Sequence, residues 1–410
     1  MLSGEAAAIT YLRQPQAIRD RCQQLFEVCK ANQLEHFTCD LSQLDAVAAY
    51  VVETTQQLYP DFQIPFHSRW RHFDAGGVPR LEQLQQLLQP VPPTTRAKSQ
   101  LDLAIVSVLL DAGAGSQWRY YDAATEQILG RSEGLAVASL KAFQQGLFSS
   151  DPASPYQADA VALQRLTEIE FAQAFQVRED NPLVGVAGRL ALLRQLGMVL
   201  VKHPARFGRH PARAGNLLDY WQSTFSGSLD AGKLLTEMLE SLGSIWPGRV
   251  EIANTNLGDV WPHPALPQAS PGANLIPFHK LSQWLTYSLV EPLTAAGLTV
   301  TNLNTLTGLA EYRNGGLCID LGLLVPKHPD VIMKAHLPSS AVVVEWRALT
   351  IVLLDLIGDR VRHLLHKSPQ ELPLIKILEG GTWAAGRRIA KQLRSNGVPP
   401  IAIQSDGTVF

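Results

Sequence analysis

The chain has 410 residues, and its 35 Lys and Arg nearly balance its 37 Asp and Glu, which leaves a formal charge of −2. This balance excludes a polycation that binds nucleic acid through its phosphates, so we expect no nucleic-acid partner. A composition of 46% hydrophobic and 18% charged residues excludes a disordered or fibrous chain.

The cysteines and the apolar segments favour neither a metal site nor a membrane span. Cys22, Cys29, Cys39 and Cys318 show no CxxC pairing, so we expect neither a zinc site nor a disulfide. The longest apolar run, at 341–357, contains three charged residues, and the N-terminus has no signal-peptide pattern. We therefore expect a cytoplasmic protein without a membrane partner; its oligomeric state stays open.

Helical periodicity dominates the chain, which predicts a mostly α fold. The predicted helices lie near 14–32, 42–57, 96–111, 133–145, 157–175, 183–200, 230–242, 278–295, 341–366 and 384–395. Stretches rich in Pro and Gly at 202–215 and 261–277 interrupt this pattern. The basic residues of the first stretch are expected on a solvated surface. The second stretch divides the chain into an N-terminal helical lobe, 1–260, and a C-terminal helical lobe, 261–410, of one integrated domain.

Basic and aromatic side chains gather in the segment IPFHSRWRHFDAGG. Arginines beside aromatic rings suit an anionic or planar ligand. We therefore take Arg69 and Arg71 as candidate substrate-binding residues, with His67 and His72 beside them.

Two polar motifs follow, LLDAGAGSQWRYY with Asp111 and GRSEGLAVASL with Arg131 and Glu133. The second precedes a small-residue helix, whose N-terminus would offer free N–H groups to a phosphate. Asp111, Arg131 and Glu133 are therefore candidate substrate contacts. Each motif also has a structural explanation, with Asp111 ending a helix, Ser132 as an N-cap and Glu133 as a favourable first-turn acid.

The segment PFHKLSQWLTYSLVEP places charged and aromatic residues on one helical face. Lys280, Trp284 and Glu291 recur there at helical spacing, opposite an apolar stripe. Aromatic rings among charges favour a cleft, so Lys280 is a candidate catalytic residue, with His279 and Trp284 as substrate contacts. The alternative is an amphipathic helix with a solvated polar side.

The segment LTGLAEYRNGGLCID contains Glu311 and Arg313, and we expect Gly315 and Gly316 to close it as a helix-breaking turn. A turn of this kind holds a carboxylate rigidly, and Arg313 and Lys280 are cations that stabilise it. Glu311 is therefore the candidate catalytic carboxylate, and Arg313 a substrate contact. The alternative is an exposed Glu/Arg turn.

Two charged residues, Glu345 and Arg347, stand among apolar residues that are expected to be core. Buried charges form internal ion pairs more often than catalytic groups, but they must be paired. We keep both as candidates that support the acid or the substrate.

The C-terminal segment LEGGTWAAGRRIAKQL predicts a Gly-rich loop that enters a helix. Such a loop could cradle a phosphate, but it does not match GxxxxGK[ST] or GxGxxG. The chain also lacks a GxSxG or HExxH motif.

Together the motifs FHSRWRHF, DAGAGSQWRYY, GRSEGLAVASL, PFHKLSQWLTYSL, EYRNGGL, VEWRALT, ILEGGTWAAGR and SDGTVF resemble the uracil catabolism protein four family of fungi and bacteria. The resemblance covers about 17–410. It departs at Ala310, where proline is expected before EYR. The resemblance implies a role in the uracil degradation route that passes through ribosylurea.

The C-terminal part also resembles the queuosine salvage nucleosidases, which are mostly helical and related to helix-hairpin-helix DNA glycosylases. The resemblance rests on Lys280 in one helix, an acid-Tyr-Arg segment that begins at Glu311, and Glu345-x-Arg347 in an apolar helix. It implies that Glu311 stands in place of a catalytic aspartate, that Lys280 is the lysine of that helix, and that Glu345 and Arg347 are a supporting pair.

The two resemblances together imply an N-ribosyl hydrolase that releases urea from ribosylurea or its 5′-phosphate. Breaking a C1′–N bond builds oxocarbenium charge on the ribose, which a carboxylate stabilises while an acid protonates the leaving group. Glu311 suits the first role, and Lys280 or His279 suits the second.

The expected partner is therefore a small ribosylated or phosphoribosylated substrate, whose phosphate would use Arg69, Arg71 or Arg131. The mechanism requires no metal and no cofactor. Two alternatives stay open, a phosphoribosyltransferase-like enzyme of uracil metabolism and a non-catalytic ligand-binding or scaffold protein of the uracil pathway.

Overall fold

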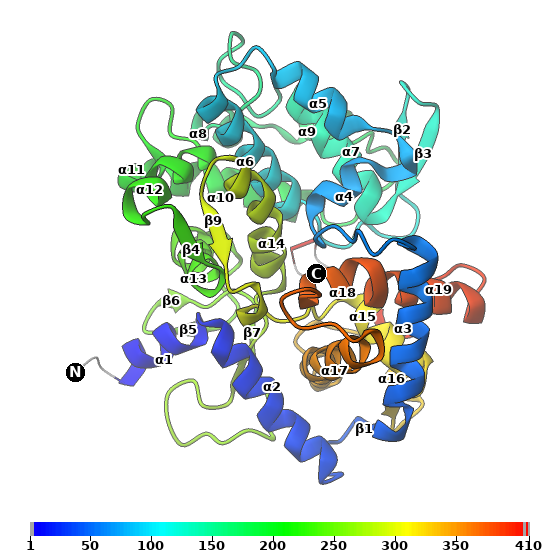
Figure 1. The fold of residues 1–410 in the computed structure, drawn as a ribbon. Helices are drawn as coiled ribbons and strands as arrows, with labels where there is room; N and C mark the ends of the chain where they lie inside the picture. Colours follow the sequence, from blue (N-terminus) through cyan, green and yellow to red (C-terminus); the bar gives the residue numbers. More distant parts are fainter. Residues whose placement is uncertain (1–3, 405–406, 409–410) are drawn as a thin grey trace.

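A computed structural model describes residues 4–404 and 407–408, and its fold is mostly α, as predicted (Figure 1). The longer helices are α1 (Gly4–Leu12), α2 (Pro15–Lys30), α3 (Leu44–Leu58), α5 (Arg80–Leu88), α6 (Pro93–Leu109), α7 (Arg131–Gln144), α10 (Val186–Lys202), α12 (Leu217–Thr224), α13 (Ala231–Leu242), α14 (Lys280–Ala295), α15 (Tyr312–Asp320), α17 (Ala341–Leu365) and α19 (Trp383–Leu393). The shorter helices are α4 (Arg69–Phe73), α8 (Ala160–Arg165), α9 (Glu168–Ala174), α11 (Pro204–Phe207), α16 (Asp330–Met333) and α18 (Leu374–Ile377).

The strands are short and pair two by two. The antiparallel pairs are β1 (Phe37–Cys39) with β10 (Leu324–Pro326), β2 (Arg119–Asp122) with β3 (Gln127–Gly130), β5 (Glu251–Ile252) with β6 (Thr255–Asn256), and β7 (Val260–Pro262) with β8 (Leu275–Pro277). The parallel pairs are β4 (Ser228–Asp230) with β9 (Thr299–Thr301), and β11 (Ala335–His336) with β12 (Ala402–Ile403). Because these pairs are small, helix packing forms the core.

Each predicted helical range falls on a helix, because an apolar repeat near 3.6 residues marks the face that a helix buries. The range 157–175 is two helices, α8 and α9. Thr167 and Glu170 form a capping box that starts the second. Four of the six residues of the SDGTVF motif lie outside the described residues.

The expectation that Gly315 and Gly316 close a turn is wrong, because both lie inside α15. A Cβ on Gly315 would lie 2.5 Å from Nε1 of Trp346 in α17, so only glycine allows this approach. On the neighbouring side, Gly386 of α19 lies directly against the backbone carbonyl of Arg313. Close packing against two helices thus offsets the intrinsic cost of glycine in a helix, about 1 kcal/mol per residue.

The Gly-rich segment before α19 is also not an open loop. Residues 378–382 form one turn of π-helix that continues into α19, and Gly380 and Gly381 are buried. A Cβ on Gly381 would lie 2.6 Å from Cγ1 of Val51 in α3. These glycines therefore serve helix packing instead of cradling a phosphate.

Helices from the two ends of the chain pack together. The N-terminal helices α2 and α3 contact α17, and in Figure 1 α3 lies beside α19. The main hydrophobic core includes buried residues from Ile18 to Ile401. The core thus joins residues on both sides of 261, where β7 and β8 form a hairpin, and the division of the chain into lobes stays a prediction.

Helix α14 runs through the middle of the molecule and packs against α6 and α13 (Figure 1). Its predicted polar face is solvated only at the Glu291 end, because Lys280 and Trp284 are buried, as is Tyr287. Tyr287 donates a hydrogen bond to the carbonyl of Thr307, 2.8 Å away. Among residues 4–404 and 407–408, no helix has the length and apolar character needed to cross a bilayer.

Candidate active site

Several helix ends meet around Lys280, the first residue of α14. Helices α4, α6 and α7 contact one another, α14 contacts α4 and α6, and α15 contacts α19. These contacts bring together side chains from segments far apart in the sequence. We call six of these polar side chains the central cluster: Arg69, His72, Asp111, Ser132, Lys280 and Glu311.

The first part of the central cluster is a network around Asp111. Arg69 is fully buried, and its Nη1 lies 2.9 Å from Oδ1 of Asp111. Ser132 donates to the same carboxylate oxygen over 2.7 Å and lies 2.8 Å from Nδ1 of His72. Ser132 also accepts from Arg69 over 3.0 Å. The network fixes the Asp111 carboxylate. The alternative that Ser132 is an N-cap is wrong, because the N-cap residue of α7 is Gly130.

Aromatic rings enclose the two histidines. His72 stacks on Trp383 with ring centroids 5.4 Å apart, and His67 lies 4.6 Å from Trp284. Nδ1 of His67 is 2.6 Å from a carboxylate oxygen of Glu379. Burial, with the Arg69 charge adding to it, lowers the pKa of His72 to about 4, so its ring is neutral at pH 7.

Two buried nitrogens beside these rings have no hydrogen-bond partner among the described residues, Nε2 of His72 and Nε1 of Trp284. A buried donor or acceptor without a partner costs about 1–3 kcal/mol. Both atoms belong to residues that contact one another through their rings. Such atoms are the ones that a polar ligand would satisfy.

Lys280 is 9% exposed, and within the described part of the chain its ammonium makes no hydrogen bond or ion pair. The charges of Asp111 and Glu311 act on it. Burial nevertheless lowers the pKa of Lys280 from its ordinary value. A buried ammonium near two carboxylates that do not pair with it is a group available to a ligand.

Glu311 caps α15. Its carboxylate accepts from the backbone N–H of Arg313 over 2.8 Å and from that of Asn314 over 2.6 Å. The rigid carboxylate expected from the sequence is therefore held by a helix N-terminus and not by a glycine turn. The neighbouring guanidinium of Arg313 is partly buried, which lowers its pKa to about 10.

Glu133 and Arg131 lie at the edge of the central cluster. Glu133 forms an ion pair with Arg387, whose guanidinium lies 4.8 Å from the Trp383 ring. Burial alone would raise the pKa of Glu133, but Arg387 and other groups lower it overall. Arg131 is exposed and donates to the carbonyl of Asn396 over 3.2 Å.

Arg347 stabilises the N-terminal end of α14, beside Lys280, through Asp259. It forms a bidentate pair with Asp259, with both distances 2.7 Å, and its guanidinium lies 4.0 Å from the Phe278 ring. Asp259 also accepts from the backbone N–H of Lys280 over 3.0 Å. The pKa of Asp259 is therefore low despite its burial. Asp259 was not predicted as a site residue, although a buried Arg347 requires an acid as its partner.

Two candidates lie outside the central cluster. Glu345 does not pair with Arg347; it accepts from the backbone N–H of His36 over 3.1 Å and lies 3.4 Å from Nε2 of His263. His279 is buried, and its Nε2 lies 2.8 Å from the carbonyl of Leu12. Burial lowers the pKa of His279. Its contact with the backbone makes it a less suitable acid than Lys280.

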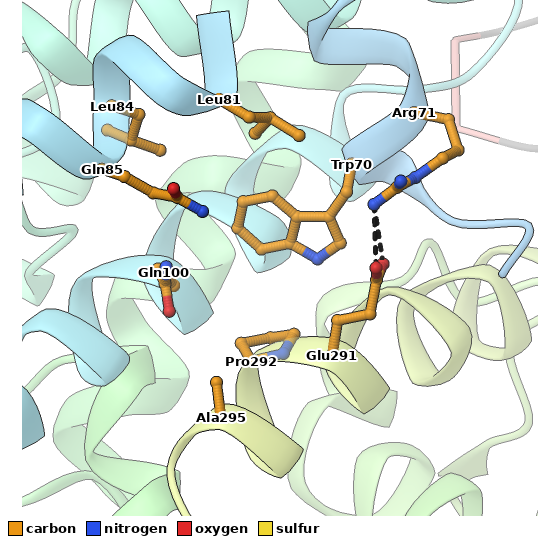
Figure 2. A pocket seen from close by; sticks show the side chains of 9 residues that line it. All are labelled: Trp70, Arg71, Leu81, Leu84, Gln85, Gln100, Glu291, Pro292 and Ala295. Atoms are coloured by element: carbon orange, nitrogen blue, oxygen red, sulfur yellow. Dashed lines mark hydrogen bonds and ion pairs between the residues drawn. The ribbon is translucent and has the colours of Figure 1, made fainter. Parts of the chain in front are cut away.

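Arg71 points away from the other candidates into a separate groove. Figure 2 shows its ion pair with Glu291, 2.8 Å long, beside the Trp70 ring. The groove has a volume of about 160 Å³ and is otherwise lined by Leu81, Leu84, Gln85, Gln100, Pro292 and Ala295. Glu291 is eleven residues after Lys280, so these two residues lie about 16 Å apart along α14.

Glu379 was also not predicted as a site residue, and Arg213 of the 202–215 stretch was not predicted to be buried. Arg213 pairs with Asp102 instead of lying on a solvated surface. Within residues 4–404 and 407–408, no group of three or more His, Cys, Asp or Glu side chains is arranged to hold a metal ion.

Comparison with known proteins gives nearly full-length matches. Residues 11–410 match the family described as "Protein of unknown function (DUF1688)". The chain is 44% identical to "Protein urg3" of Schizosaccharomyces pombe, over 96% of this chain and 97% of that protein. It is 37% identical to "Uracil catabolism protein 4" of Lachancea kluyveri, over 98% and 99%. The chain therefore belongs to the DUF1688 family, and the resemblance to the uracil catabolism protein four family is confirmed.

Proposed function

We propose that this protein acts in uracil catabolism as an N-ribosyl hydrolase that cleaves the C1′–N bond between ribose and urea. The name of the Lachancea kluyveri relative supports the pathway. The composition of the central cluster supports the reaction, because it combines fixed carboxylates with a cation that can give up a proton.

The observation that carries this proposal is the state of Lys280. Lys280 is 9% exposed, its ammonium has no partner among the described residues, and the charges of Asp111 and Glu311 act on it. A buried charge costs free energy unless it is paired. In a purely structural ion pair the ammonium would contact a carboxylate directly. Its availability fits a group that meets a substrate.

The two carboxylates are already held in place. Glu311 is fixed by two backbone amides, and Asp111 by Arg69 and Ser132. Neither therefore has to be reoriented when positive charge develops on a sugar. Preorganised charges of this kind stabilise a transition state more than mobile ones do.

In the proposed reaction, water attacks C1′ as the C1′–N bond breaks. The Glu311 carboxylate stabilises the oxocarbenium charge on the ribose. Lys280 donates a proton to the urea leaving group, and burial makes it a better acid by lowering its pKa. The proton released by the attacking water restores the ammonium. The products are ribose, or its 5-phosphate, and urea.

The surrounding rings suit a small polar substrate. Nε2 of His72 and Nε1 of Trp284 are buried without partners in the described structure and offer hydrogen bonds to a urea group or a ribose hydroxyl. Trp284 and Trp383 would also exclude water around the bond that breaks.

The test is to incubate the purified protein with ribosylurea and with its 5′-phosphate and to assay urea and the free sugar. We expect equal amounts of both products from at least one substrate. If Lys280 is the acid, kcat falls as the pH rises through its lowered pKa. Failure to release urea above the uncatalysed rate from either substrate would sink the proposal.

A further inference from the structure

Three arginines gather beside the central cluster, Arg131 from the start of α7, Arg313 from α15 and Arg387 from α19. We call them the rim arginines. We propose that they form the binding site for the 5′-phosphate of the substrate, which makes the substrate a phosphorylated ribosylurea. The identity of the sugar ligand rests on the proposed function; the site for a phosphate monoester does not.

One backbone segment and one carboxylate hold the rim arginines together. Arg131 donates to the carbonyl of Asn396 over 3.2 Å, and Arg313 donates to the carbonyl of the next residue, Gly397, over 2.8 Å. Arg387 pairs with Glu133, which is two residues from Arg131. The three guanidiniums therefore come from three helices to one place.

The rim arginines carry more positive charge than their carboxylate neutralises. Arg131 and Arg313 contact backbone carbonyls and form no ion pair within residues 4–404 and 407–408. Burial is the main reason that the pKa of each is lowered, and the charge of Arg387 adds to it in both cases. Like charges held close together are unfavourable until an anion enters. The charges of Glu133 and Glu311 offset two of the three arginines, so the rim arginines keep a net positive charge that a phosphate would neutralise.

The start of α7 adds to this preference for an anion. The helix has 14 residues, and its N-cap residue, Gly130, has no side chain that could accept from the first-turn amides, among which the Glu133 carboxylate accepts from its own. Free N–H groups and the helix dipole favour an anion at this end. Arg131 is held with a positive φ of 54°, which is strained for a residue with a side chain. The strained backbone of Arg131 and the amides of the first turn thus lie at the same end of α7.

The rim arginines are also correctly placed relative to the candidate catalytic groups. Arg313 follows Glu311 by two residues on the same helix end. The charge of Glu133 acts on Arg69 and His72 of the central cluster. A ligand anchored by its phosphate at the rim arginines would therefore present its sugar to Glu311 and Lys280.

This proposal narrows the sequence-based choice of phosphate contacts. Of Arg69, Arg71 and Arg131, the proposal keeps Arg131, which is the most exposed of the three. Arg69 is fully buried in its network with Asp111 and Ser132, and Arg71 pairs with Glu291 in the separate groove.

The experiment is isothermal titration calorimetry of the full chain with ribose 5-phosphate, ribose and inorganic phosphate. We expect ribose 5-phosphate to bind at least about 10-fold more tightly than ribose, because charge-assisted hydrogen bonds to phosphate are strong. Arg131→Gln should weaken its binding by about 10-fold or more and leave ribose binding unchanged. Inorganic phosphate should compete in the wild type and lose its effect in the variant.

Arg71→Gln is the matched control, because it removes the same charge in the separate groove and should not change any of these affinities. Arg313→Gln is the second variant and should repeat the loss. Equal binding of ribose and ribose 5-phosphate, no binding of either, or unchanged affinity in Arg131→Gln would each overturn the inference.

The outcomes also separate this inference from the proposed function. If ribose 5-phosphate binds through Arg131 but no urea is released from either substrate, the phosphate site stands and the hydrolase fails. If urea is released equally well from ribosylurea and its 5′-phosphate, and Arg131→Gln changes neither KM, the hydrolase stands and the phosphate site fails.

Discussion

Two buried ionic groups of this protein differ in how completely they are satisfied. Asp102 of α6 accepts from Nε of Arg213 over 2.8 Å, from the N–H of Ala158 over 3.1 Å and from the N–H of Gly215 over 2.6 Å. Arg213 also donates to Gln157 over 3.1 Å. In the central cluster, by contrast, the ammonium of Lys280 has no partner among the described residues.

The difference separates structure from function. Asp102 and Arg213 join α6 to the loops after α7 and α11. Nη2 of Arg213 makes no hydrogen bond, but it lies 2.5 Å from the Asp102 carboxylate, so neither charge is left for a ligand. The central cluster is less completely buried, since Ser132 and Glu311 are half-buried, and with the neighbouring Trp284 it keeps an ammonium and two ring nitrogens available. A polar group whose burial costs free energy, and which forms no contact that stabilises the fold, is best explained by a role in binding a substrate.

The substitution Lys280→Met tests this comparison most directly. We expect urea release to fall by about 100-fold to 10,000-fold, the range for loss of a general acid. The melting temperature should stay the same or rise, because an unpaired buried charge is replaced by an apolar side chain of similar length. Lys98→Met, which removes the ion pair with Asp219 at the far end of α6, is the control and should retain activity. A Lys280→Met protein with full activity would remove Lys280 from the mechanism.

The opposite result is expected for Arg213→Met. Burial already raises the pKa of Asp102, and removal of Arg213 leaves this carboxyl without its cation. Breaking a buried pair from one side costs about 3–5 kcal/mol of unfolding free energy. Urea denaturation measures this loss, and kcat per folded molecule should not change. Arg206→Met, at a partly exposed ion pair with Glu237, should cost about 1 kcal/mol or less.

Glu311→Gln tests a residue that has both a structural role, as the N-cap of α15, and a proposed catalytic role. Loss of the negative charge should lower kcat by about 100-fold to 1,000-fold, with a smaller change in KM. The loss of capping should cost only about 1 kcal/mol of stability. Asp230→Asn, at the N-cap of α13, is the matched control and should lower stability without lowering kcat. Equal kcat values for wild type and a well-folded Glu311→Gln would contradict the catalytic assignment.

Local patterns predicted the helices well and the contacts between them poorly. Helix α14 was recognisable from its spacing, and so was the position of Lys280 and Trp284 on one of its faces. Helix α15 was not recognisable, because glycine at position 315 disfavours a helix locally. The glycine is required by the close approach of Trp346, which lies 31 residues later in the chain. Long-range packing of this kind leaves no periodic signal.

The candidate site shows the same limit. Its residue types were visible in the motifs, but their partners were not. Glu345 and Arg347 were expected as one supporting pair, and the structure gives them separate partners, His263 and Asp259. Asp259 is 88 residues from Arg347 and lies just before the Pro-rich stretch 261–277, outside any predicted helix. Only the tertiary fold identifies such an acid.

The smallest expected effect concerns the pH dependence of stability, which compares His72 in the two states of the chain. Burial and the charge of Arg69 lower the pKa of His72 to about 4 in the folded protein, whereas an unfolded histidine has a pKa near 6.5. The unfolded chain therefore takes up a proton at a higher pH than the folded chain does. The stability that follows from a neutral His72 is present in full above pH 6.5 and is lost as the pH falls towards 4.

His72→Asn removes this titration. We expect the difference in unfolding free energy between the wild type and the variant to change by about 2–3 kcal/mol between pH 7.5 and 4.5, always in the direction that penalises the wild type at low pH. Urea denaturation of both proteins at a series of pH values measures it. A difference that does not change with pH would mean that His72 titrates normally, in which case the central cluster is open to water and its Lys280 is not a desolvated acid. Among the measurements proposed for this cluster, this one tests its burial without requiring a substrate.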